Sequence, residues 1–142
     1  SDTIIEDSNF QNSGINHATL SRTQFVNCNL NKANLRKSDL SFCTFKNTVL
    51  TKTSFSNSIL ENADLSGNNL KEAVFIRTKL TGADLSNTDL TGAQFTIIDF
   101  TTFKFDNAIF GNNKVKNIKV YKKDLERLNL SEEQLKEVTV VG

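Results

Sequence analysis

The chain contains no proline, methionine or tryptophan, and it has only two cysteines and one histidine among 142 residues. Without proline, every residue keeps a backbone N–H, which suits a structure built from hydrogen-bonded ladders. Two cysteines in a domain of this size do not form a disulfide scaffold and indicate a reducing compartment, so we expect a cytoplasmic protein. Because methionine is absent even from position 1, we expect the sequence to be a fragment or a processed product.

Long apolar runs and an excess of charge of one sign are also absent. The sequence has no apolar run of about 18 residues and no basic start leading into an apolar segment, so we expect neither a membrane span nor a signal peptide. Seventeen basic residues nearly cancel sixteen acidic ones, which argues against a partner selected by bulk charge alone. The length fits one domain that can bury a continuous core.

An apolar residue recurs at every fifth position from Ile5 to Val120, twenty-four times without interruption. The position two residues earlier holds Ala, Ser, Thr or Cys in nineteen of these units. A helix places residues five apart about 140° from each other, and a strand places them on opposite faces, so neither structure fits. The chain must instead turn once per five residues, with the large and the small side chain both pointing inward.

The repeat itself points to a family. Three units match an A-D/N-L-x-x tandem repeat best: Ala33-Asn34-Leu35, Ala63-Asp64-Leu65 and Ala83-Asp84-Leu85. This pattern resembles the pentapeptide-repeat family, and it runs over about residues 3 to 122. The resemblance implies a right-handed quadrilateral β-helix, in which four units make one square coil. We therefore predict an all-β solenoid of about six coils over residues 1–122, with a short C-terminal α-helical cap or dimer element over residues 123–142.

Stacking of the coils predicts which residues meet. Residues twenty apart share a face, so one interior column reads Ile15, Leu35, Phe55, Phe75, Phe95 and Val115. Stacked Phe rings in such a column should contribute more than simple burial. The frame degrades toward the C-terminus, where positions meant for small residues hold Ile98, Phe103 and Ile118. We expect the last coil or two to be widened or distorted there.

After the repeat, the pattern becomes helical. Ser131 and Gln134 form a capping box, which predicts a short helix at about 132–138, and a helical turn is expected at Asp124 to Leu128. This segment should cover the open end of the solenoid, since terminal repeats need an atypical cap. Alternatively, as in several pentapeptide-repeat proteins, it makes a homodimer. The residues predicted at this cap or dimer contact are Leu125, Leu128, Val138, Val140 and Val141.

We interpret the residues that could catalyse a reaction or bind a metal as parts of the repeat structure. His17 is the only histidine, it is predicted to face solvent, and no nucleophile motif accompanies it. Cys28 and Cys43 lie fifteen residues apart without clustered histidines, so we expect buried thiols and no metal site. Turn and ladder contacts explain the aspartates that precede the large residues, namely Asp39, Asp64, Asp84, Asp89 and Asp99. We predict no enzyme activity and no cofactor.

The sequence predicts functional residues where the polar surface pattern is broken. Val74 and Ile76 should face outward one coil below Ile97, and we predict that these three contact a partner. Lysines form two groups. Lys32 and Lys52 stack on one corner, and a second group surrounds the distorted end: Lys104, Lys114, Lys116, Lys119, Lys122 and Lys123. We interpret them as a solvated rim, because a nucleic-acid patch needs more interleaved aromatics.

Two functional hypotheses follow. The leading one is a non-enzymatic protein–protein interaction module with an unidentified protein partner. The alternative, implied by the resemblance, is a DNA mimic that binds a topoisomerase and protects it from quinolones, as Qnr and MfpA type proteins do with DNA gyrase. A DNA mimic should be acidic, whereas residues 1–50 carry four acids and five bases and residues 51–100 carry six and four. No long loop interrupts the repeats either, so the alternative is disfavoured.

Overall fold

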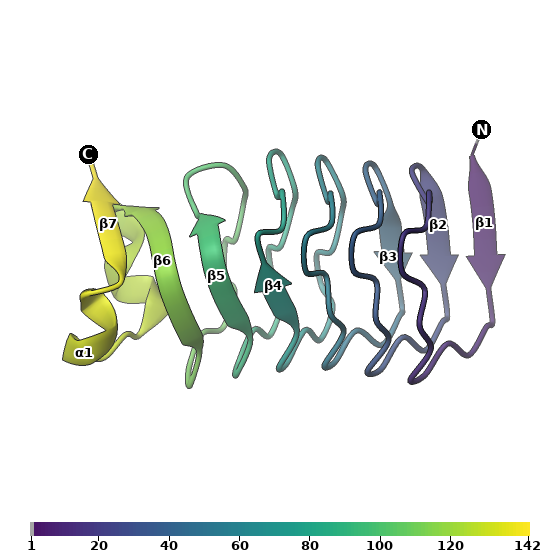
Figure 1. Cartoon of the computed structure of the whole chain (residues 1–142), viewed down its shortest axis with the longest axis horizontal. Helices are drawn as coiled ribbons and strands as arrows, with labels where there is room; N and C mark the ends of the chain where they lie inside the picture. Colours follow the sequence, from purple (N-terminus) through teal and green to yellow (C-terminus); the bar gives the residue numbers. More distant parts are fainter. Residues whose placement is uncertain (1) are drawn as a thin grey trace.

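Backbone pairing between residues twenty apart builds the fold. The computed structural model describes residues 2–142 as a right-handed quadrilateral β-helix of about seven turns, with the two termini at opposite ends of a rod (Figure 1). Each side of the first coil pairs in parallel with the second, through Ile4 and Gln24, Asn9 and Asn29, Gly14 and Asn34, and Thr19 and Asp39. The predicted fold class is confirmed.

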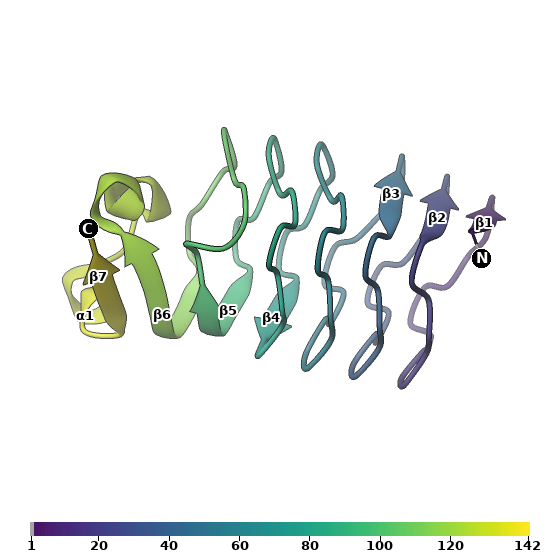
Figure 2. The ribbon, with the colours of Figure 1, turned by 90° about the horizontal axis from the view of Figure 1, so that it is seen from above.

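Two parallel sheets lie on opposite sides of the rod (Figure 2). The first contains β1 (Thr3–Glu6), β2 (Thr23–Val26) and β3 (Thr44–Lys46). The second contains β4 (Val74–Ile76), β5 (Gln94–Asp99), β6 (Lys114–Tyr121) and β7 (Val138–Val141). A 3-10 helix, η1 (Lys122–Leu128), and the helix α1 (Glu132–Leu135) separate β6 from β7.

The core is a column of large side chains alternating with small ones, as the repeat predicts. Leu50, Leu60 and Leu70 have no exposed surface, and the alanine two residues before a large side chain, such as Ala73, is equally buried. Hydroxyl groups at the small positions link the coils: Thr53, for example, donates to the carbonyl of Leu30 at 2.8 Å. These buried hydroxyls are thereby satisfied, which removes the cost of burying a polar group.

The corners of the square lie two residues after each large side chain, and most of them adopt the left-handed backbone conformation. Asparagine is the commonest residue there, because it tolerates this conformation better than most residues. Gly67, Gly82 and Gly92 occupy three of the corners, with φ of 73°, 75° and 75°. Lys32 and Lys52 occupy the same corner in successive coils.

Phenylalanine rings stack along the predicted column. The ring centroids of Phe55 and Phe75 are 5.4 Å apart, and those of Phe75 and Phe95 are also 5.4 Å apart. The planes of the second pair differ by only 4°. A second stack joins Phe25 and Phe45 at 5.1 Å. The predicted assignment of this interior column is confirmed.

The predicted widening occurs in the coil that contains β5. Ile98 and Phe103 are both buried at positions that smaller residues fill elsewhere. The N–H of Gly82 bonds to the carbonyl of Thr102, twenty residues later, whereas that of Asn62 bonds to Thr81, nineteen residues later. The hydrogen-bond register thus shifts by one residue at the turn after β5 and returns at Leu85, whose N–H bonds to Lys104; Figure 1 shows this turn as a wider loop.

The two ends of the rod differ. At the N-terminal end, the inward residues of the first coil, Ile5, Phe10, Ile15 and Leu20, remain half-buried. The C-terminal end is covered by η1 and α1 (Figure 1).

The predicted helix at 132–138 is shorter than expected. The capping box of Ser131 and Gln134 is present, but α1 ends at Leu135. Val138 begins β7 and pairs with Ile118. β-branched residues fill most of this segment and favour a strand once β6 offers an edge in the twenty-residue register. The ladder therefore extends beyond the six predicted coils.

Replacing Phe75 with alanine should lower the free energy of unfolding by about 3–5 kcal/mol, because its fully buried ring leaves a cavity between two stacked neighbours. Urea unfolding followed by circular dichroism measures this loss. Phe42→Ala is a control, since Phe42 is 48% exposed and its ring only covers the Arg22 guanidinium, a contact contributing about 0.5–1 kcal/mol. Equal losses in the two variants would contradict the stacked-column assignment.

Candidate functional site

The outer surface of the second sheet carries the predicted partner-contact residues. We call it the β4–β6 face and define it by the outward side chains of three strands: Val74, Ile76, Gln94, Thr96, Lys114 and Lys116. Val74 and Ile76 flank the buried Phe75 and are themselves half-buried. Ile76 pairs with Thr96, the residue before Ile97. The structure therefore places Ile76 beside the corner that Ile97 forms, and Val74 at the other end of β4.

Ile97 occupies its corner in a conformation that isoleucine rarely adopts. Its φ is 55°, in the left-handed region, which is an outlier for a β-branched residue and costs on the order of 1–3 kcal/mol. The residue is 43% exposed and borders a hollow of about 210 Å³ that Asp99, Asn117 and Lys119 also line. Strained backbone thus presents an apolar side chain next to a hollow.

A second hollow borders the other side of the β4–β6 face. Its volume is about 470 Å³, and Val74 lines it together with Lys71, Glu72, Gln94 and Lys114. The lining mixes an apolar side chain with both signs of charge. The face is therefore bordered by one hollow beside Val74 and another beside Ile97.

Lysines dominate the C-terminal end of the β4–β6 face. Lys114 and Lys116 are exposed on β6, and Lys119 follows on the same strand. Within residues 2–142, none of these three forms an ion pair, whereas Lys52 approaches Glu72 at 3.8 Å. The face consequently changes from apolar at β4 to basic at β6.

The residues predicted for the cap or dimer contact divide into two groups. Leu128 is fully buried, and Leu125 and Val138 pack half-buried against the core. Val140 is 45% exposed on β7, and Val141 is half-buried there. The first group packs against the core at the C-terminal end of the rod, and its role as a cap stays a prediction. Contact of Val140 with a second copy of the chain stays a prediction.

The aspartates and the histidine have the structural positions that the sequence predicts. The Asp64 carboxylate accepts the backbone N–H of Ser66 at 2.9 Å. Asp84 accepts the N–H of Ser86 in the same way, also at 2.9 Å. His17 is exposed at a corner with φ of 59°, and its N–H donates to the backbone of the next coil. These contacts make turns and do not form a catalytic group.

Acidic side chains and cysteines do not converge on a metal site. Across residues 2–142, no group of three or more His, Cys, Asp or Glu side chains is placed to hold a metal ion. Cys28 and Cys43 are both buried and free. The Cys43 thiol donates to the carbonyl of Leu20 at 2.9 Å. Burial raises the pKa of this thiol to about 11, and the Asp39 carboxylate adds to the rise.

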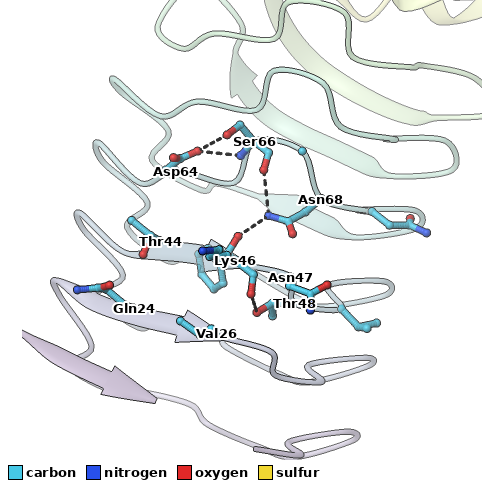
Figure 3. A pocket seen from close by; sticks show the side chains of 13 residues that line it. Gln24, Val26, Thr44, Lys46, Asn47, Thr48, Asp64, Ser66 and Asn68 are labelled. Carbon is cyan, nitrogen blue, oxygen red and sulfur yellow. Dashed lines mark hydrogen bonds between the residues drawn. The ribbon is translucent and has the colours of Figure 1, made fainter. Parts of the chain in front are cut away.

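One feature of the structure was not predicted from the sequence. An opening of about 600 Å³ lies between the third and fourth coils, on the side of the first sheet (Figure 3). Asn68 occupies an inward position there and donates its amide to the carbonyls of Phe45 and Leu65, at 2.9 and 3.0 Å. Asp64 and Lys46 are its only charged lining residues.

None of the helices that the structure describes is long and apolar enough to cross a membrane.

Comparison with known proteins identifies the repeat. A family model described as a pentapeptide repeat region matches residues 18–95. A solved pentapeptide repeat protein of the Arabidopsis thaliana thylakoid lumen is 24% identical with a TM-score of 0.54, and the alignment covers 83% of this chain and 72% of that one. At this identity the likeness shows the fold alone.

Two further solved structures are similar to the chain. Rfr23, a pentapeptide repeat protein of the cyanobacterium Cyanothece, is 24% identical over 82% of this chain and 84% of its own, with a TM-score of 0.41. A trypsin-treated variant of QnrB1, a plasmid-mediated fluoroquinolone resistance protein, is 16% identical over 99% and 90%, with a TM-score of 0.47. Among curated proteins there is no match.

The raised pKa of Cys43 predicts a pH dependence of stability. The folded state holds the thiol proton to a higher pH than the unfolded state, whose ordinary value is 9.0. Stability should therefore fall as the pH rises from about 9 toward 11, by up to about 1.4 kcal/mol per pH unit. Cys43→Ser should flatten this fall in urea unfolding, and serine fills equivalent positions such as Ser58. Identical pH dependence in both proteins would contradict the assignment.

Proposed function

The chain belongs to the pentapeptide repeat family, and from that premise we propose that it is a non-enzymatic interaction module whose protein partner docks on the β4–β6 face. The proposal rests mainly on the backbone conformation and the exposure of Ile97. An isoleucine neither stabilises the left-handed corner nor, with 43% of its surface exposed, fills the core. Local strain of this kind persists where the surrounding structure imposes it and clusters at functional sites.

Neighbouring residues extend this apolar contact. Val74 and Ile76 lie at positions that hold polar residues in the preceding coil, Ser54 and Ser56. With Ile97 they supply apolar contact area on an otherwise polar rod, and the two flanking hollows can take side chains of the partner. Apolar contact area next to polar groups is usual for protein interfaces.

The charge on the face defines the chemistry of the partner. Lys114 and Lys116 present ammonium groups at the β6 end without acidic neighbours in ion-pair contact within residues 2–142. A partner with an apolar segment that continues into acidic residues would complement both ends of the face. Electrostatic complementarity of this kind mainly raises the association rate and the specificity.

The proposal predicts that Ile76→Asp combined with Ile97→Asp abolishes capture of the partner and leaves the melting temperature nearly unchanged, because neither side chain belongs to the buried core. Capture by the immobilised protein, with the retained protein identified by mass spectrometry, measures this. Val49→Asp with Ile109→Asp is the matched control, since both residues are exposed and lie outside the face. Capture that survives the first pair, or fails with both pairs, would overturn the assignment.

The DNA-mimic hypothesis is tested in the same set of experiments. It requires an acidic surface, whereas the β4–β6 face is basic at one end and apolar at the other. We therefore expect no inhibition of DNA supercoiling by gyrase and no rescue of gyrase from a quinolone. Inhibition or rescue that does not change with the Ile76 and Ile97 substitutions would favour the mimic.

A further inference from the structure

The ladder between the third and fourth coils is interrupted at the opening beside Asn68. Elsewhere on this corner, Asn27 donates its N–H to the next coil at 3.0 Å, and Gly67 does the same at 3.0 Å. The corresponding N–H of Asn47 has no acceptor among residues 2–142, and neither have those of Leu50 and Asn69. Three backbone donors are therefore unpaired in one place.

Asn68 lies at this interruption. Its column holds Thr48 one coil before and Thr88 one coil after, and both threonines satisfy carbonyls with a hydroxyl. The longer amide of Asn68 reaches the carbonyl of Ser66 at 3.3 Å. In the twenty-residue register that carbonyl is the acceptor for the N–H of Asn47. The Asn68 side chain therefore donates to the carbonyl that the ladder would use, at the place where the ladder is interrupted.

The oxygen of the Asn68 amide is left without a donor. The residue is only 8% exposed, its nitrogen makes three hydrogen bonds, and its oxygen points into the opening (Figure 3). The oxygen is accessible to solvent, so a group that enters the opening can donate to it in place of water.

Asn113 shows that asparagine at an inward position does not by itself open the ladder. Its nitrogen donates to the carbonyls of Leu90 and Ala93, at 2.7 and 2.9 Å, and its oxygen accepts the N–H of Gly111 at 2.9 Å. The N–H of Gly92 still reaches the carbonyl of Gly111 at 2.8 Å. The unpaired groups at Asn68 are therefore specific to that site.

The unpaired groups define the ligand by its chemistry. A bare anion would meet the oxygen of Asn68, and a bare cation would meet the N–H groups of Asn47 and Asn69. The lining is otherwise mostly uncharged and polar, and the Asp64 carboxylate already accepts both the N–H and the hydroxyl of Ser66. The ligand must carry a donor and an acceptor side by side, as an amide group does.

We propose that the opening beside Asn68 is a binding site for an amide group, whose N–H donates to the Asn68 oxygen and whose carbonyl accepts a free backbone N–H of Asn47 or Asn69, two residues that line the opening. The group enters from the side and replaces the missing links of the ladder. It lies on the opposite side of the rod from the β4–β6 face (Figure 2). The test of this site is therefore independent of the function proposed for the β4–β6 face.

Two sources can supply this chemistry, a side-chain carboxamide and a main-chain peptide bond. Acetamide imitates the first and N-methylacetamide the second, while N,N-dimethylacetamide has no N–H and serves as the control. Each compound is titrated into the isotope-labelled protein, and backbone amide resonances are followed by NMR. Saturable shifts at Asn47 and Asn69 with one or both of the first two compounds, and none with the third, are expected. Tighter binding of acetamide would identify a side-chain carboxamide as the source, and tighter binding of N-methylacetamide would identify a main-chain peptide bond.

Asn68→Thr provides the matched variant, because it continues the threonine column and should close the ladder. Acetamide or N-methylacetamide should then bind at least about tenfold more weakly, whereas Asn113→Thr should leave binding unchanged. The absence of saturable shifts in the wild-type protein would show an opening filled by water alone and would overturn the proposal. Equal shifts with N,N-dimethylacetamide, or undiminished binding to folded Asn68→Thr, would also overturn it. If Asn68→Thr does not fold, the three-compound comparison on the wild-type protein decides.

Discussion

The spacing between successive coils is the constraint on which the rest of this structure depends. Backbone hydrogen bonds between coils hold it, and the space left two residues before each large side chain admits Ala, Ser, Thr or Cys without strain. Where such a residue is present, as at Thr53 and Ala73, the ladder closes and the core is sealed. At some larger residues the coil changes: Ile98 and Phe103 accompany a one-residue shift of the hydrogen-bond register, and Asn68 accompanies three unpaired N–H groups, whereas the ladder closes at Asn113.

Much of the fold could be predicted from the sequence because one period runs through most of the chain. The period requires a chain that turns once per unit, and the resemblance to the pentapeptide-repeat family implies four units per turn, which places Phe75 and Phe95 in one stack. The C-terminal strand could not be predicted, since Val138 continues a helical pattern locally and becomes a strand only because Ile118 offers an edge. The interruption at Asn68 could not be predicted either. In the sequence, Asn113 also stands at a small inward position of the repeat. Only the structure distinguishes it from Asn68, because the Asn113 oxygen accepts the N–H of Gly111.

The regular repeats and their exceptions have different roles. Aspartates such as Asp64 and Asp84, which in isolation suggest carboxylate chemistry, accept N–H groups of the following turn. Function is expected where a residue serves neither turn nor core, as at Ile97 on one side of the rod and Asn68 on the other. A solenoid allows such departures to be independent, because each coil contacts mainly its neighbours and tolerates a local change.

The central claim is that the ladder between the third and fourth coils is interrupted beside Asn68, while it closes at the same corner between the other coils. Amide hydrogen exchange measured residue by residue tests it directly. We expect the N–H of Asn47 to exchange at least about tenfold faster than the equivalent N–H groups of Asn27 and Gly67, because it lacks their hydrogen bond. Equal protection at these three corners would contradict the account.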